Sequence, residues 1–253
     1  IIFFLIALAM GVFVDILGVL FSPEFFPEAA LPSGLLMILA VIAGMLVYRR
    51  GWSIPPITTI GFVVMLLFLW IGIEYPIIGP SQAQWKWLLL LYAFAASVLP
   101  VWLLLQPRDY INSLLLYLGL GSMYVGFFVT RPAFAAPAVS ISPEGAPSMF
   151  PFVFIVIACG AASGFHSLVS SGTSAKQLNR ETDAPFVGYG AMIGESLLGL
   201  MAVLACTAGF LSREEWYAHY QSWQNAEGLG NNVGAFIGGT ARFLGELGVP
   251  TEF

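Results

Sequence analysis

The sequence predicts an all-α polytopic membrane protein, and composition, segment length and charge placement all indicate this class. Of its 253 residues, 58% are hydrophobic and 9% are charged, whereas a soluble domain carries about 25% charged residues. Apolar runs close to 20 residues long, the length that crosses a bilayer as a helix, recur along the chain. Short segments rich in proline, glycine and charge separate these runs. This pattern excludes an ordinary soluble domain.

About seven transmembrane helices are expected, all within a single transmembrane domain covering residues 1–253. We predict spans at about 1–21, 35–48, 55–73, 85–105, 111–130, 150–168 and 186–211. Pro55 and Pro56 open the third span, where a missing N–H costs nothing. An amphipathic or re-entrant segment is predicted at 233–248, because its apolar residues recur at helical spacing. Since Ile1 already lies inside an apolar run, we interpret the chain as an internal fragment of a longer protein.

Basic residues predict how these helices are oriented. Alternation of the seven spans places five basic residues on one side and three on the other: Arg49, Arg50, Arg108, Lys176 and Arg180 against Lys86, Arg131 and Arg213. Cytoplasmic loops of membrane proteins carry an excess of Lys and Arg. The side with five is therefore predicted to be cytoplasmic, and the acidic loops 22–31 and 212–232 are predicted to face outward.

The stretch from Cys159 to Ser196 is the most polar part of an otherwise apolar chain, and polar side chains in a bilayer usually serve a function. Around residues 164–174, glycines and hydroxyl residues favour a broken helix, whose unpaired backbone groups bind substrates and ions in transporters. An ordinary helix end with solvated caps is the alternative. The candidate substrate- or ion-binding residues are His166, Ser167, Ser170, Ser171, Thr173, Tyr189, Glu195 and Asp15.

Three of these candidates titrate. Glu195 lies well inside the seventh span, so its carboxylate should face a cavity or a partner, and it is our main candidate for carrying a proton. His166 has a near-neutral pKa that suits a proton relay, or it forms a hydrogen bond between helices. Asp15 lies nearer the outer end of its span. His166 and Glu195 are both reachable from the cytoplasmic side and are expected to share one cavity.

Two polar motifs are predicted in cytoplasmic loops, where charge runs commonly serve only as solvated topology signals. One contains Gln106, Arg108 and Asp109, and the other contains Lys176, Glu181 and Asp183. The sequence has no GxSxG, Walker A or HExxH motif and no Cys/His cluster of metal-ligand spacing. We therefore expect no enzymatic activity, no cofactor, no metal and no nucleic acid partner.

Two blocks of the sequence resemble a known family. Residues 99–110, LPVWLLLQPRDY, and residues 159–196, CGAASGFHSLVSSGTSAKQLNRETDAPFVGYGAMIGES, resemble the carbon-starvation protein A (CstA) family of bacterial inner-membrane transporters. The positions carrying the resemblance are Gln106, Pro107, Arg108, Asp109, Tyr110, Gly164, His166, Ser171, Gly172, Thr173, Lys176, Glu181, Asp183, Gly188, Tyr189, Gly190 and Glu195.

This resemblance implies a polytopic carrier similar to the amino acid–polyamine–organocation (LeuT-like) superfamily. It implies uptake of small peptides or pyruvate across the bacterial inner membrane during carbon starvation, coupled to a proton or a sodium ion. A membrane-embedded metabolite sensor, using the same pocket without transport, is the alternative from another class. Substrate, coupling ion and oligomeric state are left open.

Overall fold

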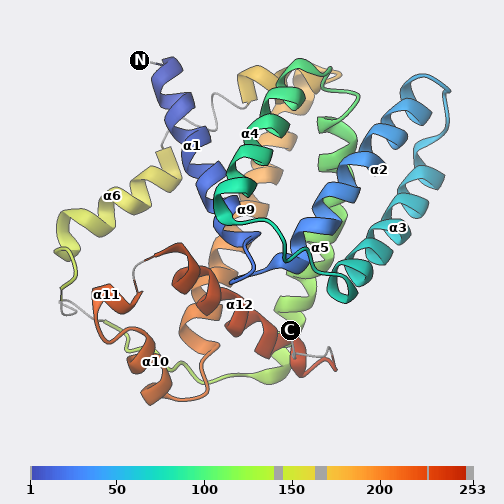
Figure 1. Cartoon of the computed structure of the whole chain (residues 1–253). Helices are drawn as coiled ribbons and strands as arrows, with labels where there is room; N and C mark the ends of the chain where they lie inside the picture. Colours follow the sequence, from blue (N-terminus) through green and yellow to red (C-terminus); the bar gives the residue numbers. More distant parts are fainter. Residues whose placement is uncertain (1, 140–144, 163–169, 227, 249–253) are drawn as a thin grey trace. The chain divides into compact units, whose positions relative to one another are not determined.

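The computed structural model describes residues 2–139, 145–162, 170–226 and 228–248, and the described residues form helices and connecting segments without strands (Figure 1). The chain divides into two compact units, residues 1–119 and 120–253. Five helices of the described part are long and apolar enough to cross a membrane. They are α1 (Ile2–Leu20), α2 (Ala30–Tyr48), α3 (Ile54–Glu74), α5 (Leu105–Thr130) and α9 (Ala184–Ala208).

Large apolar side chains cover the outside of these helices, as a bilayer-facing surface requires. Phe3 on α1 is 91% exposed, and Phe186 on α9 is 83% exposed. Soluble monomers rarely expose contiguous apolar surface of this kind. The predicted class, a helical membrane protein, is therefore supported.

The fourth predicted span is shorter in the structure than the sequence indicated, and the sixth is described only in part. α4 (Gln82–Val98) has 17 residues and ends before residue 105, because Leu99 is extended (ψ 147°) and Pro100 follows it. Proline disfavours helical geometry in the residue before it. α6 (Met149–Ala162) has 14 described residues, and residues 163–168 of the predicted sixth span lie outside the described part. Seven full-length spans are therefore not confirmed.

The fifth helix begins earlier than predicted. The sequence suggested that residues 106–110 form a turn before a span at 111–130, but α5 starts at Leu105 and includes them in its first turns. Pro107 does not prevent this, since the first backbone N–H groups of a helix have no intrahelical acceptor. α5 ends at Thr130, where Arg131 adopts a positive φ of 46° and Pro132 follows. This left-handed residue is a common helix stop.

In the first unit, α2 packs antiparallel to α3, and α1 packs against α4 (Figure 1). One core cluster consists of Leu36, Ala43, Met65 and Ile111, and a second consists of Ala40, Ala96 and Leu104. Gly72 of α3 permits the closest approach, because a Cβ there would lie 2.5 Å from the Glu28 carbonyl oxygen. Small residues of this kind let membrane helices pack backbone to backbone.

In the second unit, α12 (Leu229–Gly245) packs against α9, and the predicted amphipathic segment 233–248 falls largely within this helix. Met201, Ala205, Ala208 and Phe243 are completely buried between them. A Cβ on Gly239 would lie 2.3 Å from the carbonyl oxygen of Ala205. The two short helices α10 (Arg213–His219) and α11 (Trp223–Ala226) connect α9 to α12.

Candidate functional site

Glu195 lies midway along α9 on a strip of small residues. Gly188, Glu195 and Gly199 follow one another at helical spacing, so they share a face of α9. A Cβ built at Gly188 or at Gly199 would have no atom of the described residues within 4 Å. Glu195 itself is exposed. The carboxylate therefore shares one face of an apolar helix with two glycines, and a carboxylate in such a helix is able to bind a proton or a cationic group.

The hydroxyl-rich part of the predicted break adopts an unusual helix. Residues Ser170–Ser174 form a π-helical turn, and this turn contains the candidates Ser170, Ser171 and Thr173. π-Helical turns are rare and occur frequently at functional sites. The backbone at residues 170–174 therefore departs from a regular α-helix. His166 and Ser167 lie outside the described residues, so the cavity shared by His166 and Glu195 stays a prediction.

The loop motif between the turn and α9 is partly helical. Lys176 lies in α8 (Ala175–Gln177), and Glu181 and Asp183 lie in the 3₁₀ helix η3 (Glu181–Asp183) directly before α9. Acidic side chains stabilise the positive N-terminal end of a helix, which gives these two residues a local role at the start of α9. Tyr189, in the second turn of α9, is 66% exposed.

Asp15 has an ion-pair partner that the sequence analysis did not identify. Its carboxylate pairs with the ammonium group of Lys86, near the start of α4. Gly18, one turn after Asp15, makes room for this lysine, because a Cβ there would lie 2.9 Å from Lys86 Cγ. Both ionisable groups were predicted near the outer ends of their helices. Their pairing explains how an acid is tolerated in α1 without any contact to substrate.

Removing one partner of this pair should destabilise the protein more than removing both. Lys86→Met leaves the Asp15 carboxylate unpaired in an apolar helix, whereas Asp15→Asn/Lys86→Met leaves no unpaired charge. We expect the single variant to unfold about 1 kcal/mol more easily than the wild type and the double variant to recover most of this loss. Thermal unfolding in detergent measures both. Equal losses in the single and double variants would contradict the ion-pair interpretation.

The predicted loop motif Gln106–Asp109 joins helices of the first unit. Arg108 Nη1 donates to Tyr92 Oη of α4 at 2.8 Å, and its Nη2 donates to Asp109 Oδ1 at 2.6 Å. The next residue, Tyr110, forms a 2.9 Å hydrogen bond with Thr58 of α3. These bonds position the start of α5 against its neighbours. Tyr92 and Thr58 were missed by sequence analysis, because a lone hydroxyl in an apolar run gives no signal of its partner.

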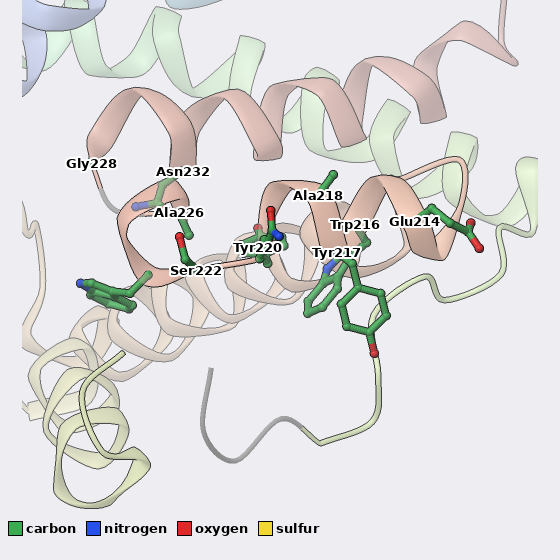
Figure 2. A pocket seen from close by; sticks show the side chains of 11 residues that line it. Glu214, Trp216, Tyr217, Ala218, Tyr220, Ser222, Ala226, Gly228 and Asn232 are labelled. Atoms are coloured by element: carbon green, nitrogen blue, oxygen red, sulfur yellow. The ribbon is translucent and has the colours of Figure 1, made fainter. Parts of the chain in front are cut away.

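A recess in the second unit was also not predicted (Figure 2). It has a volume of about 790 Å³ and lies along α10, α11 and the start of α12. Its walls include four aromatic residues, Trp216, Tyr217, Tyr220 and Trp223, together with Glu214 and Asn232. The four aromatic residues between positions 216 and 223 were the feature of the sequence that could have indicated this recess.

Hydrogen bonds to Cys206 of α9 fix part of this recess. Trp216 Nε1 donates to the Cys206 carbonyl oxygen at 3.2 Å, and the Tyr220 side chain is hydrogen-bonded to the Cys206 side chain. Burial, with a smaller contribution from Cys206, raises the pKa of Tyr220 above its ordinary value. The ring centroids of Trp216 and Tyr220 lie 4.8 Å apart. These two residues therefore pack together as one wall of the recess.

The raised pKa of Tyr220 predicts a loss of stability in alkali. The folded state holds the phenol proton more strongly than the unfolded state, so this contribution is fully present below the ordinary tyrosine pKa of 10.0 and declines as pH rises further. Tyr220→Phe should unfold more easily at neutral pH, by about 1 kcal/mol for the lost hydrogen bond. Above pH 10, its stability should fall less steeply than that of the wild type. Melting curves over this pH range test both points, and identical slopes would contradict the prediction.

The helices and the buried interfaces define the chain as a helical membrane protein, and comparison with known proteins gives its family. Residues 1–241 match the family model described as "Carbon starvation protein CstA". The chain belongs to this family. The resemblance of the two sequence blocks is thereby confirmed.

Relatives in this family are named as transporters. The chain is 34% identical to "Peptide transporter CstA" of Bacillus subtilis (strain 168), over 92% of this chain and 40% of the relative. It is 37% identical to "Peptide transporter CstA" of Helicobacter pylori (strain ATCC 700392 / 26695), over 71% of this chain and 28% of the relative. "Pyruvate/proton symporter BtsT" of Escherichia coli (strain K12) is 38% identical, over 63% of this chain and 24% of the relative. The chain thus spans less than half the length of these relatives, and no solved structure matches it.

Proposed function

We propose that this chain is part of a secondary active transporter that takes up small peptides or pyruvate-like metabolites across the bacterial inner membrane. The observation that carries the proposal is the Glu195 carboxylate midway along the apolar helix α9, on the face that also carries Gly188 and Gly199. The names of the relatives, which include a peptide transporter and a pyruvate/proton symporter, support transport as the activity. We further propose a multi-pass topology, a LeuT-like arrangement and a role in carbon starvation.

In this proposal, the π-helical turn binds the substrate, and Glu195 of α9 binds the proton. The hydroxyl groups of Ser170, Ser171 and Thr173 donate hydrogen bonds to the carboxylate that both peptides and pyruvate carry, as polar groups in broken helices do in other carriers. Glu195 accepts a proton from one side and releases it to the other. A protonated Glu195 is also far cheaper to keep in an apolar environment than a charged one, which links proton binding to movement across the bilayer.

Uptake into proteoliposomes tests the proposal directly. The intact protein is reconstituted, and uptake of pyruvate and of dialanine is measured with an imposed pH gradient, with an imposed sodium gradient and with neither. Accumulation that requires one gradient identifies the coupling ion. Counterflow of labelled against unlabelled substrate then identifies the substrate. Binding of both compounds without any counterflow is the result expected of a sensor and would reject transport.

A further inference from the structure

The recess along α10 and α11 combines a carboxylate with aromatic faces. Glu214 and Tyr217 are three residues apart on α10, so their side chains project from the same side of the helix. Tyr217 is 52% exposed, and its ring centroid lies 5.3 Å from that of Trp216. In Figure 2 the labelled side chains follow one another along the recess, with Glu214 at one end and Ser222 and Asn232 toward the other. The recess is therefore elongated, with the acid at one end.

Glu214 is the anionic side chain among the residues that line the recess. Glu215 is engaged as a helix cap, since its Oε2 accepts a hydrogen bond from the Leu211 N–H at 2.7 Å. Glu214 also has its pKa held below the ordinary value, chiefly by its own backbone N–H and then by the Ser212 hydroxyl, with a smaller effect of Arg213. Arg213 does not line the recess. Glu214 is consequently charged at neutral pH.

A recess lined by one carboxylate and four aromatic rings matches one kind of ligand. Ammonium groups bind over the faces of Trp and Tyr rings, which carry negative charge density, and an adjacent carboxylate adds direct attraction. An anion such as pyruvate would be repelled by the same two features. The amide of Asn232 and the hydroxyl of Ser222 at the far end can donate to and accept from a peptide bond. The volume of about 790 Å³ lies within the range of small-ligand sites.

We propose that this recess binds the N-terminal ammonium group of a short peptide, between the Glu214 carboxylate and the Tyr217 ring. The inference rests on the proposed function in assuming that the protein handles peptides, and it assigns the recess to peptides and not to pyruvate. Hydrogen bonds to Cys206 hold the wall formed by Trp216 and Tyr220 in place. A wall that is already in place reduces the conformational entropy lost on binding.

Binding to the intact protein in detergent, measured by calorimetry, tests the proposal independently of transport. Three probes differ in charge: alanyl-alanine amide is a cation, N-acetyl-alanyl-alanine amide is neutral, and pyruvate is an anion. We expect the cation to bind more tightly than the neutral probe. Tyr217→Leu should weaken binding of the cation about two- to five-fold, whereas Tyr217→Phe, which keeps the ring, should not. Glu214→Gln should also weaken it and should reduce its dependence on salt.

Two control variants test whether the effect on binding is specific to Glu214 and Tyr217. Tyr75→Leu and Glu24→Gln remove another exposed tyrosine and another loop acid in the first unit, and neither should change binding of the cation. Equal affinity for the cationic and the neutral probe would overturn the proposal. Tyr217→Leu with unchanged affinity, or Tyr75→Leu with an equal loss, would also overturn it. If uptake assays find no transport while these binding differences persist, the proposed function fails and the recess assignment stands.

Discussion

Replacing Glu195 with glutamine is expected to abolish gradient-driven accumulation of substrate while leaving the protein folded. Glutamine keeps the size of the side chain and its hydrogen-bonding capacity, but it cannot bind and release a proton. The glycine face around Glu195 has space for either side chain, so the fold should tolerate the change. Uptake into proteoliposomes with an imposed pH gradient measures the loss. Exchange of substrate without a gradient should continue, because it requires no net proton movement.

A matched variant controls for the loss of a carboxylate as such. Glu246→Gln removes an exposed acid at the end of α12, away from the spanning part of α9, and should leave uptake at the level of the wild type. If Glu195→Gln accumulates pyruvate and dialanine normally under the pH gradient, Glu195 does not carry the proton. If exchange and accumulation are lost together, Glu195 contributes to substrate binding instead.

Gly239→Ala is expected to destabilise the second unit strongly, because it places a methyl group against the backbone of α9. The new Cβ would lie 2.3 Å from the Ala205 carbonyl oxygen and 3.0 Å from the Ala205 Cα. Both are backbone atoms of a completely buried residue, so the two helices must separate. Overpacking of this kind costs about 1–3 kcal/mol. The higher helix propensity of alanine offsets up to about 1 kcal/mol of this cost. We therefore expect a net loss of stability.

The neighbouring glycine provides the matched control, with the opposite sign. A Cβ on Gly238 meets no atom within 4 Å in the described structure, so Gly238→Ala should stabilise the protein by up to about 1 kcal/mol. Gly126→Ala, which places a Cβ 2.2 Å from the Phe243 carbonyl oxygen, should behave like Gly239→Ala. Melting temperatures in detergent separate these cases. Equal melting temperatures for Gly238→Ala and Gly239→Ala would show that α12 does not pack on α9 in this way.

Sequence analysis predicted the long apolar helices well, because their signal is local. A run of apolar residues long enough to cross a bilayer has few alternatives to a helix, since every backbone group must be hydrogen-bonded within the segment. α1, α3 and α9 accordingly begin and end within a few residues of their predicted limits. The early start of α5 was missed, because the charged QPRDY motif resembles a loop while its proline is compatible with a first helical turn.

Contacts between helices were not predictable, because the order of helices along the chain does not specify which side chains meet. Asp15 and Lys86 are far apart in sequence. Each is a charged residue in or next to an apolar segment, and neither indicates from the sequence which residue it pairs with. The recess at Glu214 and Tyr217 depends on how α10 and α11 fold back toward α12, which no motif in the sequence indicates. Glu195 could be named as a candidate from the sequence, because one carboxylate in a long apolar run is conspicuous, and its role stays a prediction.

The bonds at the start of α5 have a mechanical consequence. A hydrogen bond weakens once its atoms separate beyond about 3.2 Å, and the bonds from Arg108 to Tyr92 and from Tyr110 to Thr58 measure 2.8 and 2.9 Å. Sliding of α3 or α4 past the first turns of α5 strains these bonds unless the side chains follow. The start of α5 should therefore move together with the parts of α3 and α4 that it bonds, and the hinges of any conformational cycle should lie elsewhere.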